Sequence, residues 1–329
     1  MILVEFDKIN RKELDGKVQT GRKRRKNEVE TMSDAIRKVR ERFRDGDVKR
    51  DAGVVDPENI LRYEDIPYGP CEENMLDVYC PEGTEGLLPT IVSIHGGGWC
   101  YGSKKLYSHY CLRLAARGFT VVNFDYRLAP EHQYPAPLED CCNLLEWILA
   151  HAEEYHIDRD NLFLVGDSAG GQLAFQLLTM LTNPKYRTLF SFAPPEGIRF
   201  RACGLNCGCY FMPVSKLVPP AKAGAMFEAY FPQDYLPCVP SLQAHKYITK
   251  KFPPAHITTA PNDYLRMMAP PLYALLRLKG VKSVLRTYGE KSQKEIGHVF
   301  HLNCHLELAD RCNDEQCAFF RSHMSKDHA

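Results

Sequence analysis

Short, nearly continuous apolar runs are the dominant pattern of the chain from about residue 61 onward. They are rich in β-branched residues, and segments with the spacing of amphipathic helices separate them. Such runs are typical of parallel strands buried on both faces, and the alternation predicts an α/β fold with a mostly parallel central sheet flanked by helices. The expected strands lie at residues 75–80, 90–94, 119–124, 162–166, 200–211, 255–260 and 283–288, and the expected helices at 107–117, 137–155, 170–182 and 272–278.

The first sixty residues are polar and highly charged, but apolar side chains recur within them at helical spacing. This spacing predicts an amphipathic helix that packs against a later part of the chain. Asn27 can cap the helix with Glu30 at the reciprocal position, and the segment Asp45-Gly46-Asp47 is expected to end it. The apolar stripe consists of Val29, Met32, Ile36, Val39 and Phe43.

One segment, Pro213–Phe252, does not fit the alternation of strands and helices. It contains six prolines and the aromatic-rich stretch "MFEAYFPQDY", and it has no clean strand pattern. Ligands of open α/β sheets bind at the carboxyl ends of the strands. An insertion that leaves this edge of the sheet would therefore form a lid over a site.

Composition and charge exclude several classes of protein. The 329 residues are 44% hydrophobic and carry 42 basic against 41 acidic side chains, so the net charge of +1 favours neither a nucleic-acid nor a membrane partner. The basic run at 21–26 lacks the interleaved aromatics of a nucleic-acid site. The start of the chain lacks the apolar core of a signal peptide, and no run approaches the roughly 18 apolar residues of a membrane span. We expect a cytoplasmic protein.

The thirteen cysteines are odd in number and scattered, which is unlike a small disulfide scaffold. Cys203, Cys207 and Cys209 lie close together, and a metal site is one interpretation of this run. No second pair of cysteines or histidine at the spacing of a zinc finger supports it. The run is equally compatible with a buried strand, where cysteine acts as a small apolar residue. We therefore expect reduced thiols and no bound metal.

The segment Gly166-Asp167-Ser168-Ala169-Gly170 has the pattern G-x-S-x-G between a predicted strand and a predicted helix. This is the context of a nucleophile elbow, in which a serine on a sharp turn projects its hydroxyl into the cleft. Gly166 and Gly170 would leave room for the close approach of the two backbones. A serine that only caps the helix is the alternative. We predict that Ser168 is a nucleophile.

A serine nucleophile needs a base and an acid, which follow it in chain order in this architecture, acid first. Asp263 comes just after the predicted strand 255–260, and His298 follows the last predicted strand. Asp263 would fix the tautomer of His298 and stabilise its protonated form. His301 and His305 compete as the base, but both fall in a following helical pattern, where histidines are usually structural.

Acyl transfer also needs donors for the oxyanion, and the stretch "TIVSIHGGGWCYGS" (90–103) can supply them. His95-Gly96-Gly97-Gly98 is a glycine-rich loop after an early strand, and it would act together with the backbone N–H of Ala169. A loop that needs glycine only for steric reasons is one alternative. A phosphate cradle is another, but its glycine spacing is forced and no acidic ribose partner is evident.

The motifs "HGGGW", "DYRLAPEHQYPAP" (125–137), "GDSAGG" and "GHVF" occur in the order seen in hormone-sensitive-lipase-like carboxylesterases and acetyl esterases, and the chain resembles this family from about residue 61 to the C-terminal helices. The resemblance implies an α/β-hydrolase core (53–329) with a helical cap built from residues 1–52 and 213–252. It also implies that Gly97, Gly98 and Ala169 donate to the oxyanion and that the catalytic triad consists of Ser168, Asp263 and His298.

The second of these motifs is expected to be structural, with Asp125, Arg127 and Glu131 pairing to pin the loops near the site. One departure from the family concerns the acid motif D-x-L-x-D, which here ends in Met267 instead of a second aspartate.

The predicted function is hydrolysis of short-chain acyl esters, mainly acetyl esters, through an acyl-enzyme and without a cofactor. An acetylated sugar or an aryl ester would be the substrate, and a homodimer is left open. An arylformamidase-like amide hydrolase and a ligand-binding protein without catalysis are the two alternatives.

Overall fold

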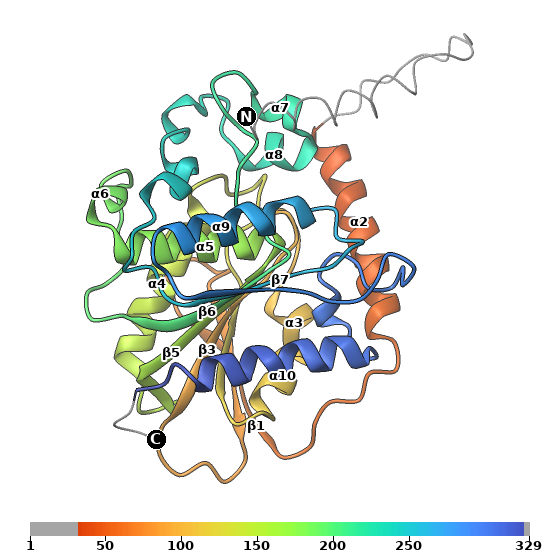
Figure 1. The fold of residues 1–329 in the computed structure, drawn as a ribbon, viewed down its shortest axis with the longest axis vertical. Helices are drawn as coiled ribbons and strands as arrows, with labels where there is room; N and C mark the ends of the chain where they lie inside the picture. The colour runs from red at the N-terminus through yellow and green to blue at the C-terminus, as the bar shows by residue number, and fades with distance from the viewer. Residues whose placement is uncertain (1–31, 326–329) are drawn as a thin grey trace. The chain divides into compact units, whose positions relative to one another are not determined.

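The computed structural model describes residues 32–325, which form one eight-stranded sheet in the order β1-β2-β4-β3-β5-β6-β7-β8 (Figure 1). The β1–β2 and β2–β4 pairs are antiparallel and the other neighbouring pairs are parallel, which confirms the predicted mostly parallel sheet. The strands are β1 (Ile60–Pro67), β2 (Met75–Pro81), β3 (Leu88–Ile94), β4 (Thr120–Phe124), β5 (Ile157–Asp167), β6 (Phe200–Asn206), β7 (Ala255–Thr259) and β8 (Ser283–Thr287).

Helices cover both faces of the sheet. They are α2 (Met32–Asp51), α3 (Lys104–Ala115), α4 (Ala136–His151), α5 (Ser168–Thr182), α6 (Pro184–Arg187), α7 (Pro220–Ala223), α8 (Ala225–Tyr230), α9 (Ala269–Leu278) and α10 (Glu307–Arg321). Short 3-10 turns lie at η2 (Leu236–Cys238), η3 (Ser241–Tyr247), η4 (Arg266–Met268) and η5 (Phe300–Leu302). Each of these helices within residues 32–325 is too short or too polar to span a bilayer.

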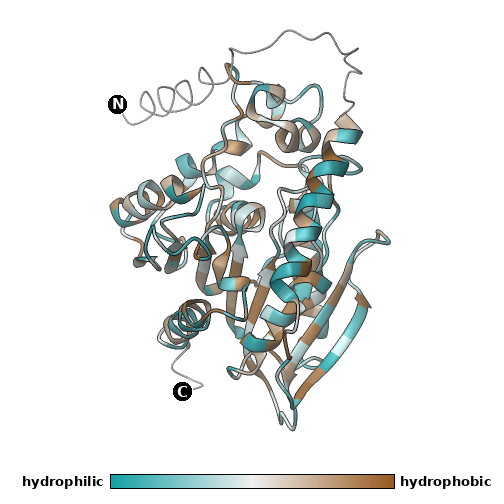
Figure 2. Cartoon of the chain, turned by 90° about the vertical axis from the view of Figure 1, so that its right-hand side faces the viewer, coloured by the Kyte–Doolittle hydropathy of each residue, from teal (hydrophilic) through white to brown (hydrophobic). Residues whose placement is uncertain are grey.

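Two apolar cores hold the layers together. Side chains of α4, α5 and α9 pack on one face of the sheet, and those of α3 and α10 pack on the other. Phe163 on β5 stacks on Phe320 of α10 at a centroid distance of 4.9 Å, and such a pair contributes about 0.5–1.5 kcal/mol beyond its buried area. The strands are largely hydrophobic, whereas α2 presents a mostly hydrophilic surface to the viewer in Figure 2.

The helix predicted in the charged N-terminal segment exists, but its expected end is wrong. It does not stop at residues 45–47, because α2 continues through Gly46 to Asp51. The last turn is held by Arg50, which pairs with Asp47 at 2.7 Å and with Asp51 at 2.6 Å. These ion pairs offset the roughly 1 kcal/mol that a glycine costs inside a helix. The expected cap at Asn27 and Glu30, the first stripe residue Val29 and the basic run 21–26 lie outside the described residues.

Two strands differ from the sequence prediction. β1 was not predicted, because it lies at the edge of the sheet and its side chains are mostly exposed or half-buried. β6 ends at Asn206 and not near residue 211, since Cys207 has a φ of +47°, which lies outside the β region. The segment 213–252, predicted to lack a strand, contains α7, α8, η2 and η3 and no strand among its described residues.

Candidate active site

Ser168 lies at a turn with no intervening loop, because β5 ends at Asp167 and α5 begins at the next residue. Its φ is +52°, the left-handed conformation of a strained turn. A Cβ on Gly166 would overlap the backbone of Gly170, and a Cβ on Gly170 would overlap the backbone carbonyls of Ile94 and His95 at the end of β3. Both glycines are therefore required for the close approach of α5 to the strands, which is the geometry of a nucleophile elbow.

The structure brings Ser168, at the start of α5, together with Asp263 and His298 from the loops after β7 and β8. His298 Nε2 lies 3.0 Å from Ser168 Oγ, and His298 Nδ1 lies 2.6 Å from Asp263 Oδ1. Asp263 is fully buried, and its carboxylate also accepts hydrogen bonds from the Thr259 hydroxyl and the Leu265 N–H, each at 2.9 Å. This arrangement can remove the proton of the serine hydroxyl and stabilise the charge that forms on the imidazole.

Backbone strain also occurs at the histidine. Val299, directly after His298, has a φ of +52°, a conformation that is a genuine outlier for a β-branched residue. The following residues form η5 and a turn, and α10 begins only at Glu307. The expected helical position is therefore wrong for His305, whereas His301 lies in the 3-10 helix η5. His301 is nonetheless structural, since it is buried and packs edge-on against Tyr110 at 5.5 Å.

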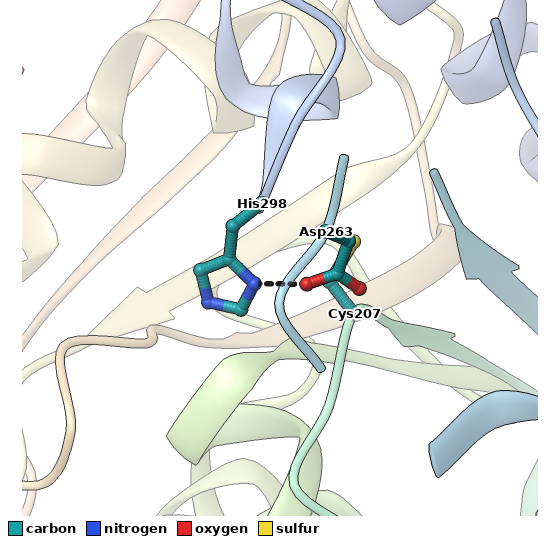
Figure 3. A group of neighbouring side chains, drawn as sticks. All are labelled: Cys207, Asp263 and His298. Atoms are coloured by element: carbon teal, nitrogen blue, oxygen red, sulfur yellow. Dashed lines mark hydrogen bonds and ion pairs between the residues drawn. The ribbon is translucent and has the colours of Figure 1, made fainter. Parts of the chain in front are cut away.

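Cys207 lies beside the Asp263–His298 pair, as Figure 3 shows, and the ligand atoms of the three residues lie within 4.8 Å of one another. His298 Nδ1 and Asp263 Oδ1 already form a hydrogen bond with each other. Burial and the charge of Asp263 hold the pKa of the Cys207 thiol well above its ordinary value, so the thiol stays protonated and is a poor metal ligand. All thirteen cysteines are free thiols. Cys203 and Cys209 do not belong to this group, so the run 203–209 does not converge on a metal-binding cluster.

The glycine-rich loop after β3 turns its backbone toward Ser168. Gly97 and Gly98 have φ values of +109° and +62° and line the same cavity as Ser168 and Ala169. Within residues 32–325, neither the Gly97 N–H nor the Gly98 N–H has a protein acceptor. The Ala169 N–H lies in the first turn of α5, where backbone donors have no partner inside the helix. These groups are free to bind an oxyanion.

The remaining motif residues support this loop. The Gly96 N–H donates to the Tyr107 hydroxyl at 2.8 Å, and that hydroxyl donates to Asp167 Oδ2 at 2.8 Å. Burial raises the pKa of Asp167 to about 7. His95 is buried and stacks on Tyr126 at 4.0 Å, and burial lowers its pKa to about 4. Asp167 thus connects the serine turn to the glycine loop through Tyr107.

The tryptophan that ends the "HGGGW" motif, Trp99, has a structural role. Its indole N–H donates to Gln172 Oε1 on α5 at 2.9 Å, and its ring stacks on Tyr230 of α8 at 4.6 Å with an interplanar angle of 6°. The side chain therefore joins the loop after β3 both to the helix that follows Ser168 and to the segment 213–252.

The loops of the second motif are pinned, but not by the predicted pairs. Arg127 binds Asp140 and Glu139 on α4, at 2.8 Å and 2.7 Å. Asp125 accepts a hydrogen bond from the Lys104 N–H at the start of α3. Glu131 pairs instead with Arg40 of α2 at 2.6 Å. The expectation that Asp125, Arg127 and Glu131 pair with one another is wrong, because each finds a partner on a helix that packs nearby.

A cavity of about 290 Å³ opens above Ser168. One wall comes from α2, another from α8, and a third from the residues around His298. The contributing side chains outside the predicted site include Arg42, Phe43, Asp47, Arg50, Met226, Phe227, Tyr264, Leu265 and Leu302. The sequence reasoning missed all of them as site residues. The helical spacing of the α2 residues and the position of Tyr264 next to Asp263 were the signals that could have found them.

A family model described as alpha/beta hydrolase fold matches residues 91–302, more than half of the chain. Curated relatives match over shorter stretches. The versiconal hemiacetal acetate esterase of Dothistroma septosporum is 37% identical over 114 residues, 34% of this chain and 35% of the relative. The arylacetamide deacetylase of Bos taurus is 37% identical over 130 residues, 36% of this chain and 30% of the relative. The chain spans about a third of the length of these relatives.

Solved structures are similar over most of the chain. Esterase B from Lactobacillus rhamnosis, inhibited with a tributyrin phosphonate, has a TM-score of 0.77 at 24% identity, covering 90% of this chain and 96% of that one. An esterase from Pyrobaculum calidifontis has a TM-score of 0.70 at 25% identity, covering 93% and 95%. These likenesses concern the fold.

Proposed function

The chain belongs to the alpha/beta-hydrolase family of the hormone-sensitive-lipase-like type, and from this membership we propose that the protein is a serine hydrolase that cleaves short-chain acyl esters. The observation that carries the proposal is the hydrogen-bonded line from Asp263 through His298 to Ser168, at 2.6 Å and 3.0 Å. The names of the matched relatives, an acetate esterase and a deacetylase, support acetyl as the acyl group.

In the proposed mechanism, Ser168 Oγ attacks the carbonyl carbon while His298 Nε2 accepts the hydroxyl proton. The N–H groups of Gly97, Gly98 and Ala169 bind the oxyanion. The protonated His298 then gives its proton to the leaving alcohol, and the C–O bond breaks to leave an acyl-enzyme. Water, deprotonated by His298, attacks this ester, and Ser168 is released with a carboxylic acid.

We further propose that α2 and residues 213–252 act as a cap over the catalytic core. The support is their contribution to the cavity, since Phe43 comes from α2 and Met226 and Phe227 come from α8. The modest cavity volume of about 290 Å³ favours small substrates over long-chain lipids. An amide-cleaving activity is the second candidate, and the match to an arylacetamide deacetylase is the observation that favours it.

The test uses 4-nitrophenyl acetate with wild-type protein and Ser168→Ala. We expect the substitution to lower kcat by at least about 10⁴-fold, because the nucleophile is lost. Thermal unfolding of the variant should match the wild type, and an organophosphate should add once to the wild type, at Ser168. Full turnover by the variant would refute the proposal. Rates on 4-nitroacetanilide, measured in parallel, show how the amide-cleaving activity compares with the esterase activity.

A further inference from the structure

Tyr264 is a large side chain that contacts the proposed catalytic histidine and remains mostly exposed. Its ring centroid lies 4.0 Å from that of His298, with the planes inclined by 36°. The residue is 63% exposed, whereas Ser168 and Asp263 below it are buried, and it lines the cavity. One part of the ring covers the imidazole, and most of the ring is left free for another contact.

The chemistry of acyl transfer determines which part of a substrate lies beside Tyr264. The oxyanion points toward Gly97 and Gly98, and the leaving oxygen must lie within hydrogen-bond reach of His298 Nε2, which protonates it. The alcohol portion of the ester therefore occupies the His298 side of the cavity. Because Tyr264 contacts His298, we place its exposed face beside the leaving alcohol and not beside the acyl group.

Apart from His298, the residues that the segments around Asp263 and His298 contribute to the cavity lining are uncharged. They are Tyr264, Leu265, Val299 and Leu302, whereas the charged groups of the lining come from α2 and Asp167. A sugar alcohol placed here would lose hydrogen bonds to water without replacement by this wall, which costs free energy. An aromatic ring placed here would instead gain a stacking partner.

We propose that Tyr264 determines the specificity for the leaving group and that the natural substrate is an ester of an aromatic alcohol, whose ring packs on Tyr264. This inference rests on the proposed esterase function. It distinguishes between the two substrate classes that the sequence left open, because it favours the aryl ester over the acetylated sugar.

The experiment compares benzyl acetate with cyclohexylmethyl acetate. Both esters release a primary alcohol of similar size and acidity, and only one alcohol is aromatic. We expect wild-type protein to prefer benzyl acetate by about 3- to 10-fold in kcat/KM, the range of a stacking interaction. Tyr264→Phe should keep this preference, and Tyr264→Leu should reduce it to less than about 2-fold, mainly by raising KM for the benzyl ester.

An acyl-side control separates specificity from general damage. The ratio of kcat/KM for benzyl acetate to that for benzyl butyrate should be the same in all three proteins, and thermal unfolding should confirm that both variants fold. An equal loss of kcat on both acetates in Tyr264→Leu, with the preference retained, would show that Tyr264 only positions His298 and would overturn the inference. So would a wild-type protein without preference for the benzyl ester.

Failure of the underlying function has a different signature. Wild-type protein that turns over 4-nitrophenyl acetate but shows no benzyl preference contradicts only the role of Tyr264. Wild-type protein that hydrolyses none of these esters contradicts the esterase proposal and, with it, this inference.

Discussion

The floor of the cavity, meaning the backbone around Gly97, Ser168 and His298, and the wall supplied by α2 are stabilised by different means. Seven non-glycine residues of the described chain have positive φ, and four of them surround the floor: Trp99, Ser168, Cys207 and Val299. Buried hydrogen bonds, such as those to Asp263 and Asp167, hold this strained backbone in place. The floor is therefore determined mainly by backbone conformation, and small displacements there alter the reacting groups directly.

The α2 wall is attached by the buried side chain of Ile36 and, on its more exposed side, by charged side chains. Arg40 donates to the carbonyls of Cys100 and Ala129, at 2.7 Å and 2.9 Å, and pairs with Glu131. Asp47 accepts a hydrogen bond from the Tyr101 hydroxyl at 2.8 Å. Half-exposed contacts of this type are screened by solvent and contribute modestly to stability. We therefore expect substitutions in the floor to lower kcat, and substitutions in the α2 wall to lower the free energy of unfolding and raise KM.

The largest effects are expected at the glycine loop. A Cβ at Gly98 would overlap only the movable side chain of Met226, whereas a Cβ at Gly97 would overlap the backbone carbonyl of Tyr101. Gly98→Ala should therefore lower kcat by about 10- to 100-fold. Its cost in stability should be limited to the roughly 1–2 kcal/mol that a left-handed φ of +62° imposes on a residue with a Cβ. Gly97→Ala should lower both kcat and the free energy of unfolding, the latter by about 2 kcal/mol or more. Steady-state kinetics and urea unfolding of the pair provide the measurement.

If Gly98→Ala loses as much stability as activity, the loop needs glycine for steric reasons and the assignment of its donors is wrong.

A second effect concerns the dependence of stability on pH. Asp167 has a pKa of about 7 in the folded protein against an ordinary 3.8, so the folded state binds its proton more tightly than the unfolded state does. The resulting stabilisation is complete below pH 4 and is lost as the pH rises through 7. It amounts to at most about 4 kcal/mol, at about 1.4 kcal/mol per pKa unit. Asp167→Asn should remove this decline in urea unfolding experiments between pH 4.5 and 7.5.

Because other groups also titrate over this range, the informative quantity is the difference between wild type and Asp167→Asn at each pH. Parallel curves for the two proteins would mean that the Asp167 carboxyl is ionised throughout.

The smallest effect is expected at the α2 wall. Arg40→Met removes the bonds to Cys100, Ala129 and Glu131 and should lower the free energy of unfolding by about 1–2 kcal/mol. It should raise KM more than it lowers kcat. Arg37→Met is the matched control, because Arg37 lies on the same helix in exposed pairs with Asp34 and Glu41, and its loss should leave the stability nearly unchanged. A loss of kcat as large as that of Gly98→Ala would abolish the distinction between floor and wall.

Much of the site could be predicted because its chemistry depends on local patterns. A serine between a strand and a helix, an acid after a later strand and a histidine after the last strand are recognisable from order alone. Contacts between distant side chains are not. Arg127 lies near Glu131 in the sequence, yet it binds Asp140 on α4, and Glu131 binds Arg40 on α2. Helix packing decides such partners, and packing has no local signature.

The sequence by itself determined most of the sheet, the serine turn, the order of Ser168, Asp263 and His298 and the glycine loop, because hydrophobic periodicity and backbone requirements act over a few neighbouring residues. Only the tertiary structure decided that α2 extends to Asp51 and lines the cavity and that Asp167 reaches the glycine loop through Tyr107. It also decided that Tyr264 stacks on His298. These features depend on distances between segments far apart in the chain, and such distances are set when the layers pack together.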